Sequence, residues 1–162
     1  MDHPERKHIR LPDFDYSLSG AYFITICAKD RRKLFSDIIM TESGVPTVRH
    51  TSIGNIVKEQ ILALENRFKH VFVARYVIMP DHIHMILHFI GSTEDSSLRE
   101  DLNAVICAFK SLTVRSVKQC YPQIDGVFQT SYYDHVIRNR QDYEEKAEYI
   151  QNNAMKWYYE HR

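Results

Sequence analysis

The sequence predicts a single α+β domain built on an antiparallel sheet, and three observations indicate it. Strand-length runs rich in aromatic and β-branched residues occur at 21–27, 71–79, 82–90 and 132–137. Between and after these runs, apolar residues recur at helical spacing. The length of 162 residues, of which 44 % are hydrophobic and 26 % charged, suits one compact domain. We therefore expect one domain over residues 1–162, with a polar N-terminal arm at about 1–13.

The first half of the chain predicts a strand, a helix and a hairpin. The first strand ends in a charged loop. Residues 51–69 then carry apolar side chains every three to four positions, which indicates a helix. The strands at 71–79 and 82–90 are separated by Pro80-Asp81, a pair typical of a tight turn. These two strands are therefore expected to form a hairpin.

The second half predicts a helix, a short strand and a further helix. Residues 91–97 form a polar linker, and Ser97 is a plausible N-cap for a helix over 98–117. The strand at 132–137 follows, and 142–159 is predicted to be a C-terminal helix. The order strand, helix, strand, strand, helix, strand is the split βαβ arrangement of ferredoxin-like folds. We therefore expect a ferredoxin-like βαββαβ sheet with an added C-terminal helix.

The strand at 82–90 carries histidines on one face. Because strand side chains alternate, His82, His84 and His88 point to one side with Ile86, and the residues between them point to the other. A divalent cation would use both neighbouring imidazoles in their neutral form and remove the cost of burying them unpaired. Hydrogen bonds from the rings to the backbone are the alternative. The pattern alone leaves both interpretations open.

The C-terminal helix places a tyrosine beside its apolar stripe. The stripe consists of Tyr143, Ala147, Ile150, Ala154 and Trp157. At about 100° per residue, Tyr149 lies roughly 120° from this stripe, and Asn153 follows one turn later on the same flank. A tyrosine in this position is either a solvated amphipathic ring or a phenolic nucleophile next to a carbonyl ligand.

Composition excludes several classes of protein. No apolar stretch is long enough to span a bilayer, and the polar N-terminus lacks a secretory segment, so we expect a cytoplasmic protein without a membrane partner. The three cysteines show no metal or disulfide pattern and are expected to be reduced. The net charge is zero, which argues against unspecific coating of nucleic acid. The cluster Lys29, Arg31 and Arg32 is either a solvated loop or a phosphate contact.

Two segments resemble a known family. Residues 76–87, with the sequence YVIMPDHIHMIL, resemble the histidine, hydrophobic, histidine motif of single-tyrosine HUH transposases. The block FQTSYYDHVIRN at 128–139, followed by Asp142-Tyr143 and Glu148-Tyr149-Ile150, resembles more specifically the REP-associated tyrosine transposases, relatives of small insertion-sequence transposases that act on single-stranded DNA. The resemblance runs from about residue 14 to residue 157.

This resemblance implies an activity and a site. His82 and His84 would hold magnesium or manganese, Tyr149 would be the nucleophile, and Asn153 would stand at the position of a polar third ligand. Single-stranded or hairpin DNA would be cut and rejoined through a 5′-phosphotyrosine. Three positions depart from the family pattern. Ala154 replaces a common proline, so the helix can continue, Asn153 is shorter than the glutamine of related enzymes, and Phe128 stands where a tryptophan is common.

Several basic residues are expected to contact DNA. Arg138 and Arg140, near the start of the last helix, are expected to contact phosphates, as are Lys29, Arg31 and Arg32. The protein is expected to be a monomer or a homodimer.

Two other functional classes remain open from the sequence. One is a non-catalytic module of the same fold that binds nucleic-acid hairpins by shape. The other is a zinc hydrolase, which would need a further His, Asp or Glu ligand beside the two histidines.

Overall fold

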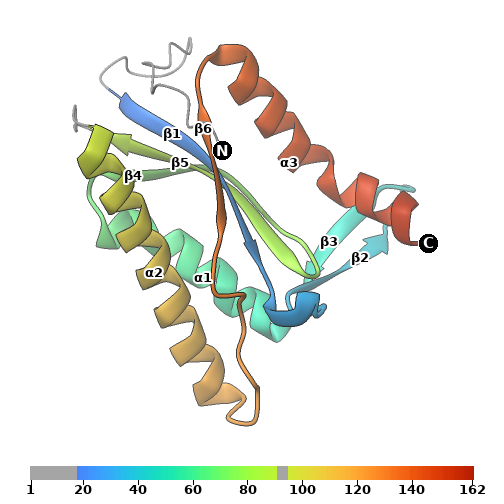
Figure 1. Ribbon diagram of the computed structural model, residues 1–162. Helices are drawn as coiled ribbons and strands as arrows, with labels where there is room; N and C mark the ends of the chain where they lie inside the picture. The colour runs from blue at the N-terminus through green and yellow to red at the C-terminus, as the bar shows by residue number, and fades with distance from the viewer. Residues whose placement is uncertain (1–17, 91–94) are drawn as a thin grey trace.

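The fold is centred on an antiparallel sheet. The structure, a computed structural model, describes residues 18–90 and 95–162, so the arm predicted at 1–13 lies outside the described residues. Within the described part, four strands form the main sheet in the order β4-β5-β1-β6 (Figure 1). These strands are β1 (Leu18–Cys27), β4 (Val71–Ile78), β5 (His82–Ile90) and β6 (Tyr133–Ile137).

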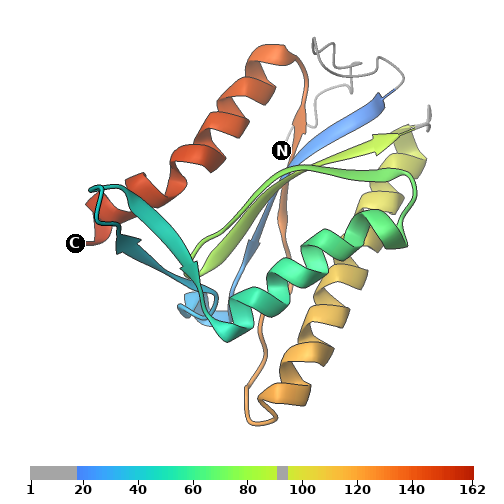
Figure 2. The same ribbon diagram turned by 180° about the vertical axis from the view of Figure 1, so that it is seen from behind.

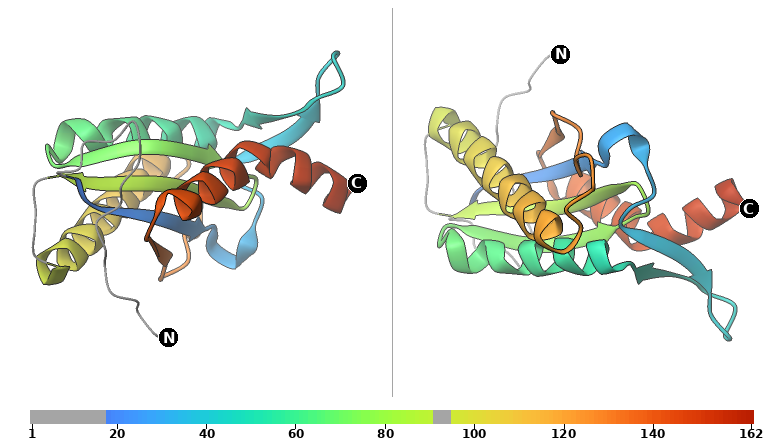
Figure 3. Two further views of the ribbon diagram at one scale, coloured as in Figure 1. Left: turned by 90° about the horizontal axis from the view of Figure 1, so that it is seen from above. Right: turned by 90° about the horizontal axis from the view of Figure 1, so that it is seen from below.

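Helices cover both faces of this sheet. Helices α1 (Ser52–Arg67) and α2 (Asp95–Cys120) lie together on one face, and α3 (Arg140–His161) crosses the other (Figures 1 and 2). The views from above and below place the sheet between these two layers (Figure 3). The predicted ferredoxin-like βαββαβ arrangement with an added C-terminal helix is confirmed. No described helix is long and apolar enough to cross a membrane.

The central strand β5 shows the predicted alternation of faces. It pairs with β1 on one side and with β4 on the other, antiparallel in both cases. Ile83, Met85 and Leu87 are fully buried in the main core against α1 and α2. Ile86 points to the opposite face, where a second apolar cluster contains Ile150 of α3. The histidines share this second face, so α3 is the element that covers them.

A second hairpin was not predicted from the sequence. Strands β2 (Ser36–Met40) and β3 (Pro46–His50) form a two-stranded sheet that contacts the C-terminal part of the fold. Each strand is only five residues long, and the burial of side chains alternates along β3 but not along β2. The usual period-two signal of a half-buried strand is therefore confined to one strand of five residues.

Side-chain caps mark the first residues of α1 and α3. Thr51 caps α1, because its side-chain oxygen accepts a hydrogen bond from the Gly54 nitrogen at 3.0 Å. Helix α2 begins at Asp95, so Ser97 lies within the helix and the predicted N-cap is wrong. Asn139 caps α3 through the Asp142 nitrogen at 2.8 Å. Helix α3 continues without a break through Ala154 to His161, as the missing proline predicted.

Candidate active site

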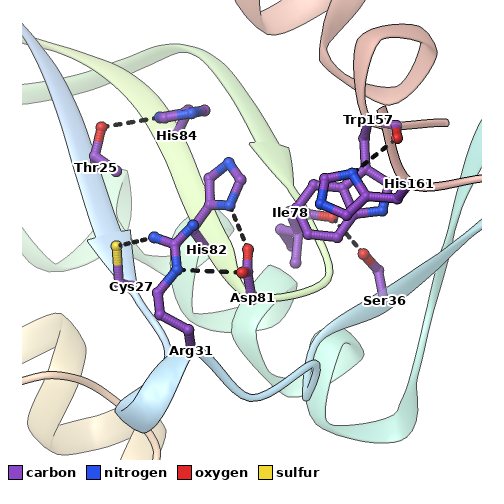
Figure 4. Close-up of polar contacts among 10 residues, drawn as sticks. All are labelled: Thr25, Cys27, Arg31, Ser36, Ile78, Asp81, His82, His84, Trp157 and His161. Carbon is purple, nitrogen blue, oxygen red and sulfur yellow. Dashed lines mark hydrogen bonds and ion pairs between the residues drawn. The ribbon is translucent and has the colours of Figure 1, made fainter. Parts of the chain in front are cut away.

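The two predicted ligands lie side by side on β5. The rings of His82 and His84 are 4.6 Å apart between centroids, and the residues are only 8 % and 6 % exposed. Both face the layer formed by α3 (Figure 4). The His-x-His spacing therefore produces a pair of buried imidazoles on one surface, as the strand alternation predicted.

A chain of polar contacts fixes the His82 ring. Its Nδ1 lies 2.6 Å from Oδ1 of Asp81, the residue that ends the β4–β5 turn. The other oxygen of Asp81 pairs with Nε of Arg31 at 3.2 Å, and Nη1 of Arg31 donates to the Cys27 sulfur at 2.8 Å (Figure 4). Asp30 and Arg31 both have positive φ, 57° and 54°, an uncommon conformation for residues with a side chain. This backbone strain is found next to the candidate site, where such strain concentrates in proteins.

The His84 ring is held from the neighbouring strand. Its Nδ1 lies 2.9 Å from the Thr25 hydroxyl, directly opposite on β1. In both histidines Nδ1 is engaged, so Nε2 is the nitrogen through which each would bind a metal. An orienting partner on the second ring nitrogen is the usual arrangement around metal-binding histidines.

The surroundings keep both imidazoles neutral. Burial, reinforced by the neighbouring His82, lowers the pKa of His84 from 6.5 to about 3. Burial also lowers the pKa of His82, although the hydrogen bond and charge of Asp81 act in the opposite direction. Because only the neutral ring has a free lone pair, both side chains are available as ligands at neutral pH.

Helix α3 brings the remaining predicted residues to this pair. The Tyr149 ring lies 5.3 Å from the His84 ring and 6.0 Å from the Phe23 ring, measured between centroids. Tyr149 is 40 % exposed, whereas Asn153 is 4 % exposed and its side chain hydrogen-bonds to His82. The Asn153 amide also donates to the Tyr149 carbonyl at 3.4 Å. One chain thus assembles two imidazoles, an amide and an accessible phenol.

Three of these residues, His82, Tyr149 and Asn153, border an open cleft of about 230 Å³. Its lining combines Arg31, Asp81, His82, Tyr149 and Asn153 with Lys156, Trp157, Glu160 and His161. Lys156 and His161 were not predicted from the sequence to belong to the site. Lys156 stands seven positions after Tyr149 on the same flank of α3, and its Nζ lies 5.2 Å from the Tyr149 ring centroid. Helical spacing from Tyr149 was therefore the signal that could have identified it.

The basic residues expected to contact DNA occupy three different places. Arg31 lines the cleft. Lys29 pairs with Asp125 at 3.1 Å, and Arg32 donates to the Asp125 and Gly126 carbonyls, so both hold the α2–β6 connection. Their contact with DNA stays a prediction.

Arg138 and Arg140 are exposed around the start of α3 and do not line the cleft. Arg140 forms an ion pair with Glu144 at 2.9 Å. The Arg138 backbone nitrogen donates a hydrogen bond to the Asp142 carboxylate at 3.3 Å, and the Arg138 guanidinium takes no part in this hydrogen bond. Their role in DNA binding also stays a prediction.

The donor set differs from that of a zinc hydrolase. In the part of the chain that the structure describes, no three His, Cys, Asp or Glu side chains are grouped to hold a metal. Asp81 orients His82 through Nδ1 and is not placed as a third ligand. The remaining polar side chain beside the two imidazoles is the amide of Asn153, which hydrogen-bonds to His82.

Solved structures of two other proteins share this fold. A search of solved structures matches a REP-associated tyrosine transposase bound to a REP hairpin, with a TM-score of 0.58 and 20 % identity over 96 % of this chain and 74 % of that one. A putative transposase from Deinococcus radiodurans matches with a TM-score of 0.51 and 13 % identity, over 88 % of this chain and 95 % of that one. At these identities the likeness establishes the fold.

Sequence comparison establishes the family. An uncharacterized protein of Haemophilus influenzae (strain ATCC 51907 / DSM 11121 / KW20 / Rd) is 30 % identical over 167 residues, covering 94 % of this chain and 89 % of the relative. The family described as "Transposase IS200 like" matches residues 17–153, which include every candidate ligand and Tyr149. The resemblance seen in the sequence is confirmed at this level: the chain belongs to the IS200-like transposase family.

Proposed function

We propose that this transposase cuts and rejoins single-stranded DNA through a 5′-phosphotyrosine formed on Tyr149, with a divalent metal held by His82, His84 and Asn153. The observation that carries the proposal is the meeting of two elements far apart in the sequence. Strand β5 supplies two neutral imidazoles, and α3 supplies an exposed phenol and a buried amide next to them. A protein that only binds DNA would have no need of this combination.

The residues present fit magnesium or manganese. The amide oxygen of Asn153 suits both hard cations, while the imidazoles of His82 and His84 favour manganese over magnesium. Such an ion, when bound, neutralises charge on the non-bridging oxygens of a phosphodiester. The chain itself supplies the neutral rings, their orientation by Asp81 and Thr25, and the shielding of the ligands from solvent.

The proposed reaction exchanges one phosphate ester for another. The Tyr149 oxygen attacks the scissile phosphorus and loses its proton to solvent, while the bond from phosphorus to the 3′ oxygen breaks. The departing 3′ oxygen takes up a proton, which leaves a free 3′-hydroxyl and a 5′-phosphotyrosine. A 3′-hydroxyl attacks this intermediate in the reverse step and rejoins a strand. No external energy source is needed because the number of phosphate esters is unchanged.

Two cations line the cleft in which the strand is cut, alongside the carboxylates of Asp81 and Glu160. Lys156 lies beside the Tyr149 ring, and Arg31 lines the cleft next to His82. The structural relative was solved with a REP hairpin, which supports a hairpin with a single-stranded flank as the substrate class. Because Tyr149 contacts His84 of its own chain, a monomer holds all the parts that the proposal requires.

The experiment compares two tyrosines of the same helix. A hairpin oligonucleotide with single-stranded flanks is incubated with wild-type protein and Mn²⁺, and covalent protein–DNA adducts are separated on denaturing gels. Tyr149→Phe removes only the phenolic oxygen and should abolish the adduct. Tyr143→Phe makes the same change on the half-buried side of α3 and should retain it. Loss of the adduct in Tyr143→Phe alone would show that the nucleophile is misassigned.

The ligands are tested by binding as well as by cleavage. Replacing His82 and His84 together with Ala should remove Mn²⁺ binding in calorimetry and adduct formation, while circular dichroism shows a retained fold. Full cleavage by this double variant would remove the metal from the mechanism. If wild-type protein binds the hairpin tightly but forms no adduct with either metal, the chain is instead a hairpin-binding module of the same fold.

A further inference from the structure

A second hollow adjoins the candidate active site. It measures about 250 Å³ and lies between β2, the β4–β5 turn and the last turns of α3. Its lining includes Lys33, Ser36, Pro80, Trp157, His161 and Arg162, and we refer to it as the Trp157 groove. Trp157 and His161 also line the cleft that contains Tyr149. The groove and the cleft thus share a wall, and a strand that leaves the cleft can enter the groove.

The shared wall is an aromatic platform. The rings of Trp157 and His161, one helical turn apart, stack at 3.9 Å between centroids with only 10° between their planes. The His161 Nδ1 also lies 3.0 Å from the Trp157 carbonyl, which fixes the pair (Figure 4). The Trp157 ring stands 6.0 Å from the His82 ring, so the platform starts at the metal-binding pair and leads away from it.

The Trp157 and His161 rings are not explained by packing in the core. Trp157 is only half-buried and His161 is exposed, so the pair contributes little to either apolar core. A flat, partly exposed ring pair is the kind of surface on which unpaired bases stack in proteins that bind single strands.

The charge of the groove complements a phosphate backbone. Nζ of Lys33 lies 5.9 Å from the Trp157 ring centroid, and Arg162 adds a second cation to the lining. The acidic residue of the lining, Asp37, is paired with Arg49 at 3.5 Å. Two cations therefore line the groove, and the carboxylate of Asp37 is engaged by Arg49.

We propose that the Trp157 groove binds an unpaired nucleotide that flanks the scissile phosphate, with its base against the Trp157–His161 pair and its phosphate at Lys33. The proposal rests on the proposed function, because the substrate strand has to pass through the adjoining cleft. Stacking on an aromatic face tolerates any base. The groove thus holds the strand in place without reading its sequence.

The chain contains its own reporter, since Trp157 is its single tryptophan. An oligothymidylate of about eight nucleotides, a length within the site sizes of single-strand binding proteins, is titrated into the full-length protein with EDTA present to prevent cleavage. Saturable quenching of Trp157 fluorescence is expected. Lys33→Gln should weaken binding several-fold, and the effect should shrink as salt rises. Lys118→Gln, which removes an exposed lysine from the last turn of α2, should leave binding unchanged.

An abasic oligomer of equal length separates stacking from charge. It keeps every phosphate but has no bases, so it should bind roughly tenfold more weakly and should not quench Trp157. Equal quenching by the abasic oligomer, or equal weakening by Lys33→Gln and Lys118→Gln, would overturn the proposal. Adduct formation by wild-type protein without any quenching would also refute the groove while leaving the proposed reaction intact. Quenching without adducts would support the groove and refute the reaction.

Discussion

Replacing His88 should make the fold markedly less sensitive to acid. His88 follows the two candidate ligands on the same face of β5, where it is 1 % exposed and its ring lies 5.8 Å from the Tyr143 ring of α3. Burial lowers the pKa of His88 from 6.5 to about 4. Between these two values the unfolded chain binds a proton at this position that the folded chain does not. The free energy of unfolding therefore falls as the pH drops through this window.

The size of the effect follows from the two pKa values. With 6.5 in the unfolded chain and about 4 in the folded protein, linkage gives a loss of about 2 kcal/mol on going from roughly pH 7.5 to pH 5. His88→Gln removes the titrating group. Urea unfolding of both proteins, followed by circular dichroism at the two pH values, should show that the variant loses about 2 kcal/mol less than the wild type over this range.

A packing control isolates the titration. Ile86→Val shortens a buried side chain on the same face of β5 without changing a charge, so its cost of about 1 kcal/mol should be the same at both pH values. If wild type and His88→Gln lose equal stability between the two pH values, His88 titrates normally in the folded protein. The stated link between its burial and its pKa would then be refuted.

Three further outcomes follow from the structure. Asn139→Ala removes the cap that accepts from the Asp142 nitrogen, and thermal unfolding should show a loss of about 1 kcal/mol. Gly54→Ala would place a Cβ 1.8 Å from the Phe35 carbonyl oxygen, so α1 or β2 must shift; a melting temperature equal to that of wild type would contradict this close approach. Calorimetry should find tighter binding of Mn²⁺ than of Mg²⁺, because imidazole ligands favour the transition ion, and His84→Ala, which leaves one imidazole, should reduce this preference.

Part of the site could be predicted from local periodicity. Strand alternation determines that His82 and His84 share a face, and any strand conformation of this segment has the same consequence. Helical spacing likewise determines that Asn153 follows Tyr149 on one flank of the last helix. The order of elements was sufficient to predict the sheet, because few topologies satisfy the usual rules of connection.

Other parts depend on contacts between distant segments. The basic loop at 29–32 reads as one cluster in the sequence, yet the fold directs Arg31 to Asp81 and turns Lys29 and Arg32 toward residues 125–126. The β2–β3 hairpin was missed because its strands are only five residues long, pair outside the main sheet, and show regular alternation only in β3.

The sequence by itself determined the pair of imidazoles, the flank of the helix that carries the tyrosine, and the family. The tertiary structure decided that this flank lies over the imidazoles, that Asp81 and Thr25 occupy their Nδ1 atoms, and that Trp157 extends the site outward. The physical reason is that periodicity records only which side chains of one element point the same way. Which elements then face each other depends on the burial of Ile86 and Ile150 between β5 and α3, a contact between residues far apart in the chain.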